Sequence, residues 1–146
     1  MGKGQPFAEF IGEIKAFVDA NKATPGFERL MVIMDKALAD YDDLFKTMAG
    51  YAAAGQTTLL PFYARRVLTA TSQLYAGFCI LDQALIADKK AKEVGPEHFD
   101  YNFYIGKVAS ANYYVKNIVP NIGAIAAVVK EADTSCLDLP LEGFMF

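Results

Sequence analysis

Three stretches of the chain carry apolar residues at steps that alternate between four and three positions, and this pattern restricts the fold more than any other feature. In the first stretch the steps join Met31, Met34, Leu38 and Tyr41. A repeat that averages 3.5 residues keeps one face of a long helix on neighbours that cross at a shallow angle of roughly 20°. The pattern therefore predicts long helices packed side by side. The complete seams are Phe27, Met31, Met34, Leu38, Tyr41, Phe45, Met48 and Ala52; then Leu60, Ala64, Val67, Thr71, Leu74, Phe78, Leu81 and Leu85; then Tyr104, Val108, Ala111, Val115, Ile118, Ile122, Ile125 and Val129.

A shorter apolar face precedes these seams, so the sequence predicts helices over residues 6–21, 25–54, 59–93 and 97–132. Short connections between long helices favour antiparallel neighbours. We expect one all-α domain spanning residues 1–146, an up-and-down four-helix bundle with an irregular apolar tail over residues 136–146. The apolar face of the first helix is Phe7, Phe10, Ile11, Ile14, Phe17 and Val18.

Residues with special backbone or capping behaviour set the expected ends and irregularities of these helices. Thr24 and Thr58 are expected N-caps, and Gly55 and Gly95 are expected stops. Pro120 lies inside the last helix and should kink it, because proline has no N–H to donate. We expect Gly106 and Gly123 to allow close approach of another helix.

Composition excludes several classes of protein. The chain has 146 residues, 53% of them hydrophobic, which is enough for a single core, and a formal net charge of −3. Lysine and arginine form no dense stripe, so we expect no nucleic-acid partner. No run of about 18 apolar residues is present, so we expect no membrane span and a cytoplasmic location. We expect no disulfide between Cys79, interpreted as a small core residue, and Cys136.

Charge is distributed unevenly among the predicted helices. The second helix has a normal charged outer face, whereas the third carries only Arg65 and Arg66 between residues 59 and 81, and the fourth only Lys107 and Lys116 between residues 104 and 129. A helix that is apolar on nearly all sides is buried on nearly all sides. We therefore expect a partner surface over the last two helices, unless the tail or the first helix covers it. The residues opposite the seams are Phe62, Thr69, Ala76, Ile80, Gly106, Tyr113, Pro120 and Ala124.

No pattern of catalytic or metal-binding residues accompanies this surface. His98 is the single histidine and has no glutamate three residues before it, so the paired Glu-x-x-His ligands of a di-iron bundle are missing. We interpret Asp40, Asp42 and Asp43 as a solvated helix face and expect no metal site. Arg65 and Arg66 could hold an anion in their planar forks, or could pair with nearby carboxylates.

Several segments resemble the C-terminal helical domain of one kind of acyl-CoA dehydrogenase. They are Pro61-Phe62-Tyr63-Ala64-Arg65-Arg66-Val67-Leu68, Phe103-Tyr104-Ile105-Gly106-Lys107-Val108-Ala109-Ser110-Ala111, Val115-Lys116-Asn117-Ile118-Val119-Pro120 and Leu137-Asp138-Leu139-Pro140-Leu141-Glu142-Gly143-Phe144, with the opening Lys3-Gly4. The likeness covers almost the whole chain. It rests on packing residues rather than on a catalytic signature.

The resemblance implies an accessory domain of an FAD-dependent enzyme of fatty acid metabolism, with no catalytic residue, FAD ligand or other cofactor of its own. FAD would belong to the parent enzyme, whose body or a second copy would be the partner. The chain would be an excised C-terminal domain or a shortened relative. If it touches acyl-CoA, Arg65, Arg66, Lys107 and Lys116 are the candidates. Two other functions stay open: a free-standing helical dimerisation module, and a bundle that binds a small apolar ligand in its interior.

Overall fold

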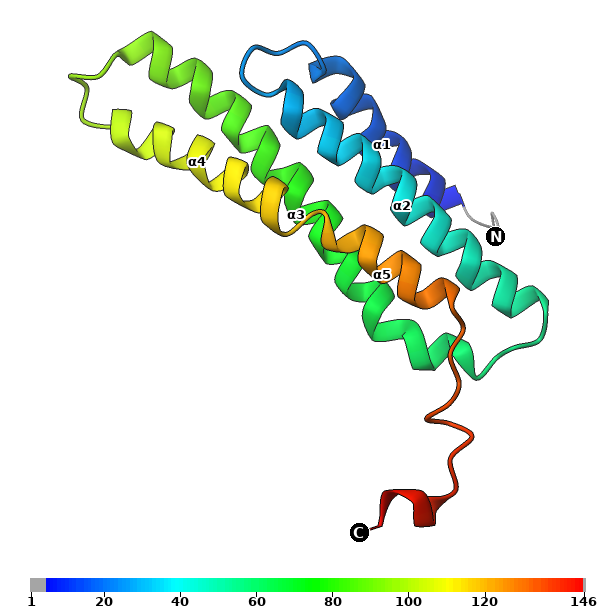
Figure 1. The fold of residues 1–146 in the computed structure, drawn as a ribbon. Helices are drawn as coiled ribbons and strands as arrows, with labels where there is room; N and C mark the ends of the chain where they lie inside the picture. Colours follow the sequence, from blue (N-terminus) through cyan, green and yellow to red (C-terminus); the bar gives the residue numbers. More distant parts are fainter. Residues whose placement is uncertain (1–4, 146) are drawn as a thin grey trace.

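A computed structural model describes residues 5–145, and all regular structure among these residues is helical (Figure 1). The all-α prediction is therefore confirmed. The resemblance at Lys3-Gly4 and the last tail residue, Phe146, lie outside the described residues. The elements are α1 Gln5–Asn21, α2 Glu28–Ala53, α3 Leu59–Val94, α4 Tyr101–Asn117, α5 Asn121–Lys130 and the short 3-10 helix η1 Leu141–Phe144.

The bundle has four rod-like members: α1, α2, α3, and a fourth that α4 and α5 form end to end (Figure 1). α2 and α3 run side by side in the centre. α1 packs on α2, α4 packs along one half of α3, and α5 packs between α2 and the other half of α3. This arrangement leaves one side of α4 and α5 turned away from the bundle.

The expected single helix over residues 97–132 is wrong, because the chain breaks at Pro120. Proline donates no backbone hydrogen bond. The backbone hydrogen bonds on either side of it span five or three residues instead of the four of an α-helix. The N–H of Val119 donates to the carbonyl of Tyr114 at 3.2 Å, and that of Asn121 donates to Ile118 at 3.0 Å. The start also moves to Tyr101, because residues 95–100 form a turn.

The glycines predicted to end helices do so, whereas the threonines predicted to cap helices do not make capping hydrogen bonds. Gly55 and Gly95 end α2 and α3 as expected, each with a positive φ, of 73° and 76°. Thr24 does not cap α2: the positive φ of Gly26, 86°, delays the helix, and the Thr24 carbonyl accepts from the N–H of Phe27 in a turn. Thr58 occupies the N-cap position of α3, but its side chain makes no capping hydrogen bond.

The core confirms the α2 seam through Met31, Met34, Leu38 and Tyr41, all of which are buried. Phe45 and Ala52 of the same seam are exposed and Met48 is half-buried. Half of the fourth seam is buried, and its remaining members are half-buried: the buried ones are Ala111, Val115, Ile122 and Val129.

The α3 seam is displaced by about one residue from the predicted one. Only Leu74 and Leu81 of the predicted seam are buried, and Ala64 is exposed. A helix that is apolar nearly all round carries little information about which side faces the core. The residues of α3 that face the core are Leu59, Tyr63, Ala70, Leu74, Gly77, Leu81, Ala84, Ala87 and Ala91.

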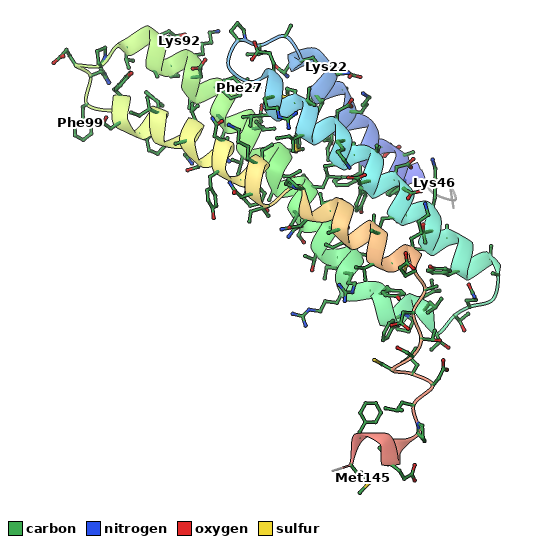
Figure 2. The ribbon with its side chains drawn as sticks, viewed as in Figure 1. Lys22, Phe27, Lys46, Lys92, Phe99 and Met145 are labelled. Carbon is green, nitrogen blue, oxygen red and sulfur yellow. The ribbon has the colours of Figure 1, made fainter. Side chains whose placement is uncertain are left out.

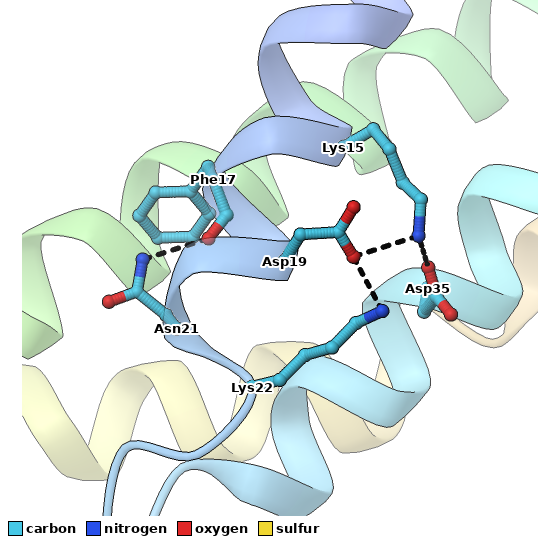
Figure 3. A network of polar contacts seen from close by, with 6 residues as sticks. All are labelled: Lys15, Phe17, Asp19, Asn21, Lys22 and Asp35. Atoms are coloured by element: carbon cyan, nitrogen blue, oxygen red, sulfur yellow. Dashed lines mark hydrogen bonds and ion pairs between the residues drawn. The ribbon is translucent and has the colours of Figure 1, made fainter.

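Lys15 fastens α1 to α2 through a polar network at the surface (Figure 3). Its ammonium donates to Asp35 Oδ1 at 2.7 Å and to Asp19 Oδ1 at 2.9 Å, and Lys22 also pairs with Asp19. The hydrogen bonds that Lys15 donates to Asp35 and Asp19 raise the pKa of its ammonium above the ordinary value. α1 is thus held over α2 by charge as well as by its aromatic contacts.

The tail leaves the end of α5 and does not return to the bundle (Figure 1). Figure 2 labels Met145 at its far end, well away from the helices. Its apolar side chains are exposed, so neither α4 nor α5 is covered by it. They are Leu137, Leu139, Leu141, Phe144 and Met145.

Candidate functional site

The outer side of α4 and α5 is an uncovered apolar surface. Gly106, Tyr113, Pro120 and Ala124, which the sequence places opposite the core seam, are all exposed. Tyr113 is 66% exposed and Phe103, one turn before Gly106, is 61% exposed. We call this surface the α4/α5 strip: Phe103, Gly106, Tyr113, Pro120, Ala124 and Val128.

No carboxylate accompanies this strip. Between Asp100 and Glu131 the sequence contains no Asp or Glu, and its charged residues are Lys107, Lys116 and Lys130. α2 is different, since its outer face holds aspartates paired with lysines. A large exposed apolar surface with few charges is typical of a protein–protein contact.

On α3 the predicted outer residues are only partly exposed. Phe62 and Thr69 are exposed, whereas Ala76 and Ile80 are half-buried. The sequence interpretation missed more exposed apolar side chains, because it took the core-facing side of α3 to be one residue away. These are Leu68, Tyr75 and Ile86.

Lys107 lies in an apolar groove between α3 and α4. Its ammonium donates to Gln83 Oε1 at 3.0 Å and lies 5.4 Å from the centroid of the Phe103 ring. The cation is thus engaged by an amide and an aromatic face. The groove has a volume of about 280 Å³ and is lined by Gln83, Ile86, Ala87, Phe103, Tyr104 and Lys107.

Arg65 and Arg66 lie in a second groove, between α3 and α5, which we call the arginine groove. It has a volume of about 380 Å³, and its lining residues are Phe62, Arg65, Arg66, Thr69 and Ile125. The ion pairs found in residues 5–145 do not include either arginine. The expected alternative, a pair bonded to nearby carboxylates, is therefore not what this part of the chain shows.

Lys116 lines a third hollow, against α2, with Arg29, Lys36 and Asp40. Lys36 already donates to Asp40 at 2.6 Å. The four candidate acyl-CoA contacts therefore lie in three separate hollows and do not converge on one ligand. These residues do not fit a CoA or FAD site built within this domain.

The other residues singled out from the sequence occupy ordinary environments. His98 lies exposed in the turn before α4, where its Nδ1 accepts from the N–H of Asp100 at 3.1 Å. Cys79 is half-buried, Cys136 is exposed, and both are free. The thiol of Cys79 raises the pKa of the Tyr75 hydroxyl through a hydrogen bond. Asp40, Asp42 and Asp43 pair with Lys36, Lys46 and Lys130.

The described residues contain no helix long and apolar enough to span a membrane. They also contain no group of three or more His, Cys, Asp or Glu side chains arranged to hold a metal ion.

The family model described as "Acetyl-CoA dehydrogenase C-terminal like" matches residues 10–140. The chain belongs to this family. It is the C-terminal helical domain found in acyl-CoA dehydrogenases, so the resemblance seen in the sequence is confirmed. The matched range begins within α1, takes in α2 to α5 and ends in the tail.

Curated relatives carry this domain as one part of a longer chain. Two proteins from Syntrophomonas wolfei, each named butyryl-CoA dehydrogenase, are 39% identical over 145 residues, which is 99% of this chain and 23% of theirs. A broad-specificity linear acyl-CoA dehydrogenase, FadE5, from Mycobacterium tuberculosis is 27% identical over 147 residues, covering 97% of this chain and 24% of that protein. The chain spans about a quarter of the length of the curated relatives it matches.

Proposed function

We propose that this chain is the accessory C-terminal domain of an FAD-dependent acyl-CoA dehydrogenase, with a structural role in assembling the enzyme. The domain packs its α4/α5 strip against the flavin-binding body and contributes no catalytic residue. The observation that carries the proposal is the strip itself. Its large side chains are exposed, and neither the tail nor α1 covers them.

The energetic argument follows from the exposed area. Fully burying a Phe or similar side chain stabilises a contact by about 1.5–3 kcal/mol. Phe103, Tyr113 and Val128 are 61%, 66% and 43% exposed, so covering them contributes only that part of a full burial for each. The few lysines beside them are at its edge or engaged by Gln83, so little charge must be desolvated when a partner covers the strip.

FAD and acyl-CoA belong to the rest of the enzyme in this proposal. In such enzymes FAD accepts a hydride from the β-carbon of an acyl-CoA. The three separated hollows of this domain do not assemble a site for either molecule. The proposal includes a cytoplasmic location, which fractionation of the source cells would test.

Domain replacement in the Syntrophomonas wolfei butyryl-CoA dehydrogenase tests this function. The segment of 145 residues that matches this chain is replaced by it, and a second version lacks the segment altogether. We expect the chimera to keep its flavin absorbance and its butyryl-CoA oxidation, and the deletion to lose both or to aggregate. Full activity in the deletion would contradict an assembly role.

A free-standing dimerisation module is the second candidate, because the same strip could be covered by another copy. Sedimentation of the purified 146-residue chain with and without Phe103→Glu and Tyr113→Glu tests this candidate, because the two changes would abolish a dimer formed through the strip. An interior site for a small apolar ligand is the third candidate, and it gains no support from the hollows described above, since none of them is lined by the fully buried side chains Met31, Met34 or Leu74.

A further inference from the structure

We propose that the tail of one copy of this chain binds in the arginine groove of a second copy. The tail segment concerned is residues 139–145, and the groove is the one lined by Phe62, Arg65, Arg66, Thr69 and Ile125. This surface is separate from the α4/α5 strip, so the inference does not depend on the strip packing against a dehydrogenase body.

The tail has the composition of a segment that binds elsewhere. Over residues 136–145 it holds Asp138 and Glu142 and no Lys or Arg. Leu141 is 75% exposed and Met145 73% exposed, although both are strongly apolar. A segment that carries Glu142 in the short helix η1, among exposed apolar side chains, fits a groove that is apolar and basic.

The groove offers the matching chemistry. Phe62 and Ile125 supply apolar contact, and two guanidinium groups lie beside them. Arginine forms bidentate hydrogen bonds with a carboxylate, and such charge-assisted bonds are stronger than neutral ones. Neither arginine takes part in the ion pairs of residues 5–145, so both are available to Glu142 of an incoming tail.

The turn at the base of the tail favours the groove of another copy over its own. The carbonyl of Thr134 accepts from the N–H of Leu137 at 2.7 Å and from that of Asp138 at 3.1 Å, and the Thr134 hydroxyl donates to the Asp138 carboxylate at 2.7 Å. These bonds send the chain away from the bundle, into the extended Pro140 (Figure 1). In this conformation the tail points away from its own bundle, and a groove on a neighbouring copy can receive it without any change in this turn.

Reciprocal exchange of two tails would give a twofold dimer in which each copy supplies the same groove and the same segment. The two contacts are then identical, and a change to one residue alters both. This property makes a charge-reversal test decisive.

The experiment uses two charge-reversed versions of the 146-residue chain. One carries Arg65→Glu with Arg66→Glu, which reverses the groove, and the other carries Glu142→Arg, which reverses the tail. Sedimentation velocity measures the dimer in each sample. We expect the unchanged chain to dimerise and each variant alone to dissociate about tenfold more easily or worse, because like charges then meet twice.

Mixing the two variants in equal amounts is the decisive measurement. Each tail then faces a groove of opposite charge on the other chain, so we expect dimers to return to near the level of the unchanged chain. If tails bind in their own grooves, or if the strip alone drives association, mixing restores nothing, and that result would overturn the proposal.

Glu97→Arg provides a charge-matched control, since Glu97 lies in the exposed turn before α4. We expect it to leave the dimer unchanged. Loss of the dimer in this control as well would point to net charge rather than to the groove, and would also overturn the proposal. Either failure leaves the domain-replacement result untouched, so the two proposals are tested separately.

Discussion

Gly77 of α3 faces Val119, the residue at the break between α4 and α5, so closely that a methyl group does not fit between them. A Cβ placed on Gly77 would lie 2.9 Å from Val119 Cγ2 and 3.2 Å from Met34 Sδ. The absence of a side chain at Gly77 therefore allows the fourth rod to bend onto α3 at Pro120.

Gly77→Ala should destabilise the domain although alanine is the better helix former. Alanine gains about 1 kcal/mol of helix propensity. Val119 is branched at Cβ and fully buried, so it cannot turn aside, and overpacking of this kind costs about 1–3 kcal/mol. Urea unfolding followed by circular dichroism measures the difference.

Gly12→Ala is the matched control, because nothing lies within 4 Å of a Cβ at Gly12. We expect it to stabilise the domain by about 0.5–1 kcal/mol. Equal effects of the two substitutions would show that the contact between Gly77 and Val119 is unimportant.

Tyr51→Phe should lower the free energy of unfolding by about 1 kcal/mol, the usual value of one hydrogen bond. The Tyr51 hydroxyl donates to the carbonyl of Val129 at 2.7 Å and so ties the end of α2 to the end of α5. Tyr113→Phe is the control, because the Tyr113 side chain is largely exposed on the strip, and we expect a change within about 0.5 kcal/mol. An equal loss in both variants would contradict this assignment.

We expect the stabilising contribution of Tyr51 to depend on pH in the alkaline range. Burial raises the pKa of the Tyr51 hydroxyl above its ordinary value of 10.0. The neutral form is the one favoured by folding, so its stabilising contribution is complete below the unfolded pKa and is lost as pH rises through the folded pKa. Absorbance at alkaline pH should show late ionisation whose amplitude falls in Tyr51→Phe, leaving that of Tyr75 and Tyr114, whose pKa values are also raised.

We expect the stabilising contribution of Asp19 to depend on pH in the acid range. Hydrogen bonds from Lys22 and then Lys15 hold the pKa of its carboxyl below the ordinary value of 3.8 (Figure 3). Its contribution is therefore present above the unfolded pKa and is lost as pH falls through the folded pKa. NMR titration of the carboxyl should show a low midpoint that rises in Lys22→Met and at high salt, since exposed pairs are screened. A midpoint insensitive to both would contradict the network.

The contrast between α2 and α3 explains which parts of the fold could be predicted. On α2, charged residues such as Asp35 and Asp42 mark the outer side, so the buried seam through Met34 and Leu38 was identified correctly. On α3, few charges fix the rotation of the helix, and its small buried residues, Ala70 and Gly77, do not stand out in an apolar pattern. The predicted face was displaced by one position for this reason.

Contacts between distant segments lay beyond the sequence pattern. The prediction of close approach was right for Gly123, where a Cβ would lie 2.7 Å from Asp40 Oδ2, and wrong within this chain for Gly106, which meets nothing within 4 Å. The sequence singled out Arg65 and Arg66 as one candidate for holding an anion, which stays a prediction, whereas the part played by Ile125 in the arginine groove depends on how α5 turns after Pro120.

The α4/α5 strip predicts opposite behaviour in the isolated chain and in the enzyme. Phe103→Glu with Tyr113→Glu should leave the unfolding free energy of the isolated chain within about 0.5 kcal/mol, because both side chains are mostly exposed. In the domain-replacement chimera the same pair should cause loss of activity or dissociation, since charges would be buried in a contact. An unchanged chimera would contradict a docking role for the strip.

Hydroxyl-radical footprinting of Tyr113 and Phe103 tests the central claim most directly, because it reports the solvent access of the strip itself. The reaction is compared in the isolated 146-residue chain, at a concentration where it is monomeric, and in the chimeric butyryl-CoA dehydrogenase. The account predicts rapid modification of both side chains in the isolated chain and strong protection of both in the enzyme. Equal modification in the two samples would show that the strip stays exposed to water and would contradict the account.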